Sequence, residues 1–186
     1  MSILLTGLAI FIAIHLLPTF LVQRRALIDK LGYVPYLVVF SVISLVGFLM
    51  IICGFSLAPR TALYSPMAVA PVVAQAVMPL VFILLLSAYL KTHIRDKLKH
   101  PMLIATAMWA IVHLLANGDS ATVILFAGFL SYAIADILMA KPRESLIPSG
   151  AASIVHDAIA VVGGLVLYGV VMQSHQALFG VTVVGG

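Results

Sequence analysis

Six long runs of apolar residues, separated by short polar segments, divide the chain. Each run is long enough to cross, or nearly cross, a hydrocarbon core about 30 Å thick. A spanning segment must satisfy its own backbone hydrogen bonds, so we expect helices, and the sequence lacks the alternating ten-residue segments of a membrane β-barrel. The pattern predicts an all-α, polytopic bundle of six transmembrane helices at 2–22, 34–57, 70–90, 101–117, 120–139 and 152–172.

The composition agrees with this assignment, because 63% of the residues are hydrophobic and only 9% are charged. The first run has no basic segment before it and no cleavage site leading to a polar chain, so we expect a retained helix. One transmembrane domain covering 1–186 is predicted. Cys53 is the only cysteine, which excludes an internal disulfide and a cysteine-rich zinc site; we expect it to be packed inside the bundle.

The basic residues are distributed very unevenly between the two sides of the predicted bundle. One side carries only Arg60, and the other carries the remaining nine of the ten Lys and Arg residues. The positive-inside rule therefore places both termini outside. The basic charge calls for no nucleic acid, and the lipid bilayer is the expected partner. The cytoplasmic basic residues are Arg24, Arg25, Lys30, Lys91, Arg95, Lys97, Lys99, Lys141 and Arg143.

Two histidines lie deep inside apolar runs. His113 belongs to a polar stripe on one face of the fourth run. His15 lies in the first run, just before Pro18, which frees the carbonyl of Ile14. At 1.5 Å per residue, His15 lies about 20 Å below the outer end of its helix and His113 about 18 Å above the inner end of its own, so their levels are similar. The full stripe is Met102, Thr106, Trp109, His113 and Asn117.

Two deep imidazoles on separate helices are what a b-type haem needs, because haem b requires axial ligands but no local motif. We therefore expect a bis-histidine haem b site with His15 and His113 as metal ligands. His100, His156 and Lys99 are candidates to hold the propionates near one edge. Trp109 and Asn117 complete the cofactor-binding set, although core packing for Trp109 and a helix-end turn for Asn117 with Asp119 are the simpler interpretations.

The remaining polar groups lie near the helix ends. Asp157 begins the sixth run beside His156, and Gly163 and Gly164 should let that helix approach a neighbour closely. Tyr132 and Asp136 end the fifth run, and we expect an interfacial ion pair between Asp136 and Lys141. We expect no carboxylate near the deep histidines. His93 and His175 are predicted to lie in solvated loops, with 175–186 a surface tail.

The chain resembles the NnrU family of integral membrane proteins along nearly its whole length. The likeness rests on IHLLPT around His15, on HPML from His100, on W-x-x-x-H-L-L-A-N-G-D around His113, on Asp136 and on H-x-x-L-F-G-V in the tail. The family takes its name from gene clusters for nitrite and nitric oxide reduction. It also contains the haem b zeta-carotene isomerase, which acts on a cis double bond of a carotenoid precursor.

By position, the resemblance implies His15 and His113 as axial ligands and His100 as a supporting residue. It implies a haem protein of the bacterial inner membrane, either a redox-gated cis-trans isomerase of a polyene or a protein of nitrite and nitric oxide metabolism with a small gaseous ligand. The redox partner is not implied. One departure weakens the isomerase: if that chemistry exchanges a histidine for a thiolate, 101–117 offers no cysteine, and Ala110 occupies the turn before His113.

Several other interpretations stay open at this stage. The deep histidines could serve only in hydrogen bonds between helices, or they could form a proton-coupled transporter with Asp157. The segment Lys99-His100-Pro101 is similar to an element of isoprenylcysteine-type methyltransferases and sterol reductases, which would make the chain a membrane enzyme without haem. A zinc hydrolase is disfavoured by the lack of H-E-x-x-H, and a Ser-His-Asp triad by the lack of a nucleophile elbow.

Overall fold

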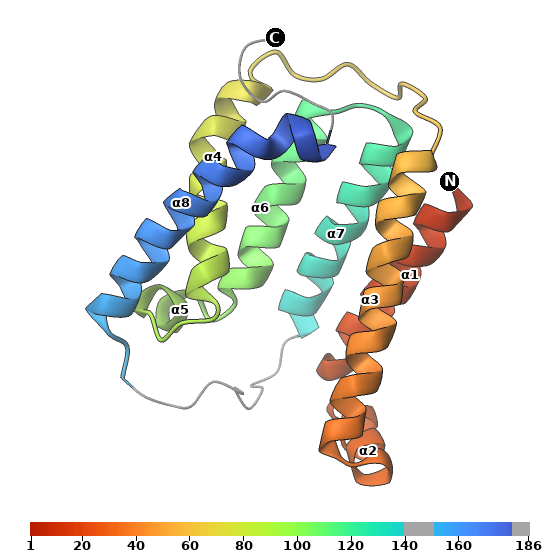
Figure 1. The fold of residues 1–186 in the computed structure, drawn as a ribbon, viewed down its shortest axis with the longest axis vertical. Helices are drawn as coiled ribbons and strands as arrows, with labels where there is room; N and C mark the ends of the chain where they lie inside the picture. Colours follow the sequence, from red (N-terminus) through yellow and green to blue (C-terminus); the bar gives the residue numbers. More distant parts are fainter. Residues whose placement is uncertain (140–150, 180–186) are drawn as a thin grey trace. The chain divides into compact units, whose positions relative to one another are not determined.

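The structure, a computed structural model, describes residues 1–139 and 151–179, and these consist of helices and their connections (Figure 1). This described part contains no strand, only one isolated antiparallel bridge between Ala62 and Asp119. The all-α prediction is therefore confirmed for it. The helices form two compact units: Met1–Ser65 with Asn117–Pro142, and Pro66–Ala116 with Arg143–Gly186.

Among the described residues, five helical stretches are long and apolar enough to cross a membrane. Their outward faces are apolar as well, and Val42, Leu45 and Leu49 of the second stretch are exposed. Such faces suit lipid rather than water, so the chain is a multi-pass membrane protein. The stretches are Ser2–Thr19, formed by α1 (Ser2–Leu16) and the 3-10 turn η1 (Leu17–Thr19), then α3 (Tyr33–Leu57), α4 (Ala70–Ser87), α7 (Ser120–Met139) and most of α8 (Ile154–Phe179).

The predicted fourth span corresponds to α6 (Pro101–Ala116), which has 16 residues. Proline at its first position suits a helix start, because the missing N–H would have no partner within the helix. The carbonyl of His100 accepts the backbone N–H of Ile104 at 3.1 Å. Since 16 residues extend about 24 Å, α6 is shorter than a usual span. That α6 crosses the membrane as one of six spans, and the orientation of the termini, stay predictions.

Two short helices lie where the sequence predicted basic loops. The first, α2 (Leu21–Leu31), ends at Gly32, whose φ of +85° is a conformation that glycine adopts readily. The second, α5 (His93–Leu98), begins after Thr92, whose hydroxyl accepts the Arg95 backbone N–H at 3.0 Å. The loops between the predicted spans are thus partly helical. Their helix-forming residues and their capping residues, Gly32 and Thr92, form short helices without a long apolar run.

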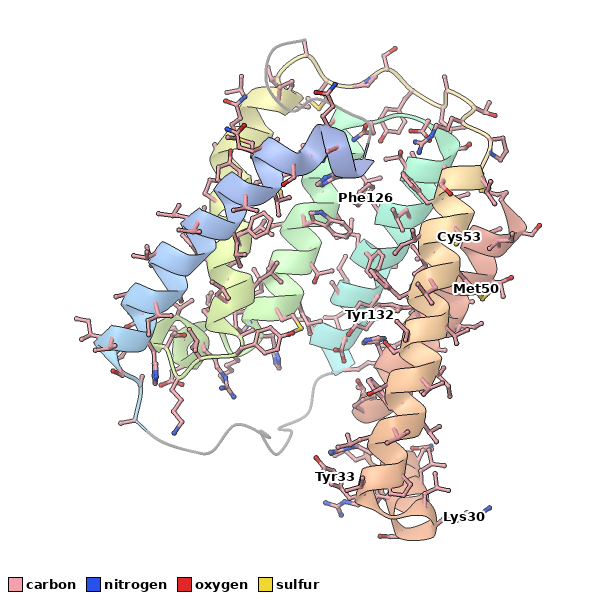
Figure 2. The ribbon with its side chains drawn as sticks, in the orientation of Figure 1. Lys30, Tyr33, Met50, Cys53, Phe126 and Tyr132 are labelled. Atoms are coloured by element: carbon pink, nitrogen blue, oxygen red, sulfur yellow. The ribbon has the colours of Figure 1, made fainter. Side chains whose placement is uncertain are left out.

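In the first unit, α1 packs tightly against α3 through glycines. A Cβ on Gly54 would lie 2.4 Å from the backbone nitrogen of Leu4, and a Cβ on Gly7 would lie 2.7 Å from that of Ile51. Small residues allow such an approach of two membrane helices. The thiol of Cys53 faces outward from α3 (Figure 2), so the expectation that it is packed inside is wrong. On a lipid-facing surface a small apolar side chain needs no packing partner.

In the second unit, α4 packs against both α6 and α8 (Figure 1). Gly164 lies against the α4 backbone, where a Cβ would meet the nitrogen and Cα of Ile83 at 2.7 Å. Gly163 faces the side chain of Leu86, at 2.9 Å from a Cβ position. The close approach predicted for these two glycines is confirmed, and it brings the start of α8 to the α4–α5 turn.

Candidate functional site

His15 lies in the last turn of α1, and a hydrogen bond within the same helix holds its ring. Its Nδ1 lies 2.7 Å from the carbonyl oxygen of Phe11. Because a carbonyl oxygen only accepts, Nδ1 carries the proton, and the lone pair of the neutral ring lies on Nε2. This is the tautomer in which an imidazole ligates a metal through Nε2 while its other nitrogen is held by a protein carbonyl.

Aromatic side chains from three helices surround the His15 ring. Phe11 stacks on it with 4.0 Å between ring centroids. Phe40 of α3 and Tyr132 of α7 meet it edge-on at 5.4 and 6.2 Å. Directly after His15, α1 gives way to the 3-10 turn that contains Pro18. The predicted opening of the helix is confirmed, and the ring orientation is fixed from several sides.

Asp136 is a buried carboxylate in the neighbourhood of His15. It is only 2% exposed, and its Oδ1 accepts a hydrogen bond from the hydroxyl of Thr19 at 2.6 Å. The hydroxyl of Tyr132 lies 3.5 Å from Oδ2, and Asp136 acts electrostatically on His15. The expectation that no carboxylate lies near the deep histidines is therefore wrong. Lys141, its predicted ion-pair partner, lies outside the described residues.

The sequence did contain a signal for this carboxylate. Tyr132 and Asp136 are four residues apart in an otherwise apolar span, so they share a face of α7. Figure 2 labels Tyr132 on the half of α7 that leads to Asp136. Two polar residues on one face of a membrane helix point to a partner within the protein. That partner, Thr19, is 117 positions from Asp136 in the sequence, so no local pattern identifies it.

His113 repeats in the second unit the arrangement found around His15. Its Nδ1 lies 2.8 Å from the carbonyl oxygen of Trp109, four residues earlier in α6. The same reasoning places the proton on Nδ1 and the lone pair on Nε2. The Trp109 ring lies 5.3 Å from the His113 ring between centroids. Trp109 therefore contacts the candidate ligand directly through both its backbone and its side chain.

The polar stripe of α6 lies between small residues that are fully buried. Ala105 and Ala110 have no exposed surface, and because they are five residues apart they flank the stripe on either side. His113, in the middle of the stripe, is half-buried, and Met102 at its start is 38% exposed. The hydroxyl of Thr106 donates to the carbonyl of Met102 at 2.9 Å, within the same helix.

A third histidine, His175, lies within electrostatic range of His113. It belongs to α8, which continues to Phe179, so its predicted position in a loop and the predicted start of a surface tail at 175 are wrong. The segment after the predicted end of the sixth span contains helix formers such as Gln173, Gln176 and Ala177, which extend the helix although the apolar pattern weakens.

The candidate propionate ligands lie at helix starts in the second unit. His100 immediately precedes α6, after Lys99, whose backbone adopts a φ of +59°. His156 lies in the first turn of α8, and its Nδ1 is a buried side-chain nitrogen without a hydrogen-bond partner in the described part of the chain. An unsatisfied buried ring nitrogen is costly, and an anionic or accepting group would satisfy it. Within residues 1–139 and 151–179, no hydrogen bond or ion pair joins His100, Lys99 and His156 to one another, so their shared role stays a prediction.

His93 and Asp157 form an ion-pair geometry where α5 begins beside α8. The His93 Nδ1 lies 2.6 Å from Oδ2 of Asp157, and the His93 backbone N–H donates to Oδ1 at 2.9 Å. The expectation of a loop histidine is wrong, although the side chain is 57% exposed. Nearby, the Ser153 backbone N–H donates to the Lys91 carbonyl at 3.0 Å. These contacts fix the α4–α5 turn to the start of α8.

The sequence Asn117-Gly118-Asp119 forms the turn that leads into α7, as predicted. Gly118 leaves no room for a side chain, because a Cβ there would lie 1.9 Å from the carbonyl oxygen of Tyr64. Asp119 caps α7 by accepting the Thr122 hydroxyl at 2.6 Å and the Ala121 and Thr122 backbone N–H groups, both at 3.1 Å. A cofactor contact of Asn117 stays a prediction.

Arg60 faces this cap, with its Nη1 3.4 Å from the Asp119 carboxylate. Burial raises the pKa of the Asp119 carboxyl, but the hydrogen bonds from Thr122 and Ala121 and the charge of Arg60 outweigh it. The pKa of Asp119 therefore lies below its ordinary value. The capping carboxylate is a structural group of the turn between α6 and α7, and its interactions explain it without a ligand.

The residues present fit a haem in one specific respect. His15 and His113 are each held in the Nε2-ligating tautomer by the carbonyl four residues earlier. Among the described residues, no three metal-ligating side chains gather into one group. Haem needs no such group, because the porphyrin supplies four ligands and the protein adds one or two. His15 belongs to the first unit and His113 to the second.

Comparison with known proteins gives one positive result. A search of the curated proteins and a search of the solved structures each return no significant match. The family model described as NnrU protein matches residues 3–183, which is nearly the whole chain. The resemblance seen in the motifs around His15, His100 and His113 is thereby confirmed. The chain belongs to the NnrU family of proteins.

Proposed function

We propose that this chain is a b-type haem protein of the bacterial inner membrane, with the Nε2 atoms of His15 and His113 as axial ligands. The observation that carries the proposal is the paired hydrogen bond from Nδ1 to the carbonyl four residues earlier, 2.7 Å at His15 and 2.8 Å at His113. In each ring the bond from Nδ1 to the carbonyl of its own helix leaves Nε2 as the nitrogen that would ligate iron.

The chain's own residues would hold and shield the cofactor. Phe11 and Trp109 contact the two imidazoles and limit their rotation. His100, Lys99 and His156 would bind the propionates, and the buried Nδ1 of His156 has an unused hydrogen-bonding position for one. When bound, the haem supplies an iron that takes up electrons and a small ligand or polarises a polyene double bond.

The two histidines suit more than one kind of haem chemistry. A haem enzyme, either a polyene isomerase or an oxidoreductase, and a haem protein that senses or carries ligands in nitrogen-oxide metabolism both fit the two histidines. The lack of cysteine in 101–117 disfavours an exchange of a histidine ligand for a thiolate within α6. A methyltransferase-like enzyme without haem rests on Lys99-His100-Pro101 alone, and it is the alternative that the experiment tests.

The test is the visible spectrum of protein purified from membranes in detergent, with and without added haem. We expect a Soret band and sharp α and β bands on reduction, the signature of low-spin haem with two nitrogen ligands. His113→Ala and His15→Ala should each remove the low-spin spectrum or convert it to a high-spin one. Protein that stays colourless after reconstitution would overturn the proposal and favour the haem-free alternative.

His93→Ala is the matched control, because His93 is outside the spans and its Nδ1 is engaged by Asp157. It should retain the wild-type spectrum. If His15→Ala also retained it while His113→Ala did not, the second axial ligand would be another residue. The double variant His15→Ala/His113→Ala would then separate one shared haem from two independent sites through the haem-to-protein ratio.

A further inference from the structure

The structure places a carboxylate within the apolar helix α7 of the first unit, where two hydroxyl groups contact it. Asp136 of α7 is 2% exposed, and Thr19, 8% exposed, donates to it at 2.6 Å. The hydroxyl of Tyr132 approaches the other carboxylate oxygen at 3.5 Å. Asp136 lies about one turn before the end of α7, and a carboxylate buried there is costly unless hydrogen bonds satisfy it.

The two hydroxyl groups that contact Asp136 here, those of Thr19 and Tyr132, both belong to residues beside His15. Thr19 ends the 3-10 turn that follows His15 and contains Pro18, so its bond to Asp136 attaches this turn to α7. Tyr132 presents its ring edge to the His15 imidazole, 6.2 Å between centroids. The carboxylate also acts electrostatically on His15. One buried charge therefore restrains the segment after His15 and one wall of its ring.

We infer that Asp136 is the positioning residue for His15: through Thr19 and Tyr132 it sets the orientation of the His15 imidazole and the electrostatic field at a metal bound there. The inference rests on the proposed function, because it concerns haem ligation by His15. It assigns Asp136 a role that a simple interfacial ion pair would not have. It also makes Thr19 the residue that transmits this role along α1.

A fixed negative charge has a defined effect on haem iron. It stabilises the oxidised, more positive state relative to the reduced one, and this effect is strong where the dielectric constant is low. Removing the charge should therefore raise the reduction potential of a haem ligated by His15. Removing only the Thr19 hydroxyl should instead loosen the turn after His15 and change the ligand-field geometry.

The experiment measures the midpoint potential and the low-spin ferric electron paramagnetic resonance spectrum of the haem-loaded protein in detergent. The variants are Asp136→Asn, Thr19→Val and Tyr132→Phe. We expect Asp136→Asn to raise the potential and shift the g-values at unchanged haem content. Thr19→Val should shift the g-values, and Tyr132→Phe should do so less, because it keeps the ring against His15 and loses only the longer bond.

Two comparisons separate positioning from general destabilisation. Thr19→Ser retains the hydroxyl donor and should restore the wild-type spectrum and potential. Ser56→Ala removes a hydroxyl from α3 in the same unit, where it bonds to the Cys53 carbonyl of its own helix at 2.9 Å. It should change neither readout. If Asp136→Asn is recovered in too low a yield, the Thr19→Val and Thr19→Ser pair makes the same test.

The outcomes distinguish this inference from the proposed function. Wild-type protein without low-spin haem, or low-spin haem unaffected by His15→Ala, overturns the assignment of His15, and the positioning role falls with it. Haem that needs His15 but keeps its g-values and potential in both Asp136→Asn and Thr19→Val overturns the positioning role alone. A shift in Thr19→Val that Thr19→Ser does not reverse counts against transmission through the hydroxyl.

Discussion

The two compact units hold their deep histidines in the same way but surround them with different polar groups. His15 and His113 each donate Nδ1–H to the carbonyl four residues earlier. Beside His15 the first unit buries the carboxylate of Asp136, whereas the second unit places another histidine, His175, within electrostatic range of His113. The shared hydrogen bond sets the same tautomer in both rings. The different neighbours, a carboxylate and a histidine, imply that the two imidazoles experience different electrostatic fields.

Asp136 of the first unit and Asp157 of the second unit are held in different ways. Asp136 of the first unit is bonded to hydroxyl groups and is nearly inaccessible. Asp157 of the second unit pairs with His93, whose side chain is 57% exposed. A buried hydrogen-bonded charge depends strongly on its partners, while an exposed ion pair contributes little. Substitutions in the two units should therefore differ in effect even where the chemistry removed is similar.

The largest effect is expected from the glycine contacts that hold each unit together. Gly54→Ala puts a Cβ 2.4 Å from the Leu4 backbone, and Gly164→Ala puts one 2.7 Å from the Ile83 backbone. Since backbone cannot move aside, each should destabilise its unit by about 3 kcal/mol or more. Thermal unfolding in detergent, followed by circular dichroism, measures this loss.

Gly169→Ala is the control for the glycine substitutions, because a Cβ there meets nothing within 4 Å. It should leave the unfolding temperature unchanged or raise it slightly, since alanine favours helix by about 1 kcal/mol. Equal changes in unfolding temperature at positions 54, 164 and 169 would show that close packing does not determine the effect at positions 54 and 164.

The next effect concerns the buried carboxylate of the first unit. Asp136→Ala leaves the Thr19 hydroxyl without its acceptor and should cost about 1–3 kcal/mol in unfolding free energy. The double variant Asp136→Ala/Thr19→Val should cost less than the sum of the single variants, because the same bond is lost in each. Denaturation in mixed detergent micelles gives the three values. Strict additivity would contradict a direct interaction between these two side chains.

Much of this architecture follows from local sequence signals, and the rest depends on contacts that no local pattern contains. The apolar runs predict α1, α3, α4, α6, α7 and α8, and the NGD turn is recognisable from its residues alone. The bond between Thr19 and Asp136 joins positions 117 apart, so the nearer Lys141 was the natural expectation. Likewise, His175 acts electrostatically on His113 because α8 continues beyond its apolar stretch, which the apolar pattern does not predict.

The stability of the first unit should depend on pH through Asp119, which caps α7 outside the spans. Its pKa in the folded protein lies below the ordinary value, so its contribution to stability is present at neutral pH. That contribution is lost as the pH falls below about 4, through the folded-state pKa. Unfolding temperatures of wild type and Asp119→Asn, measured from pH 7 to pH 3, should converge at the acid end. A constant difference would exclude this carboxylate as the titrating group.

The smallest effect should come from the exposed pair of the second unit. His93→Ala removes the Nδ1 contact with Asp157 at 2.6 Å but keeps the backbone N–H bond at 2.9 Å. The α4–α5 turn therefore stays attached to α8, and the unfolding temperature should fall less than in Asp136→Ala. Asp157→Ala removes both bonds and should lower it further than His93→Ala. If His93→Ala instead matched or exceeded Asp157→Ala, the imidazole would hold this turn through a contact other than the carboxylate, and the contrast between a buried and an exposed acid would fail in the second unit.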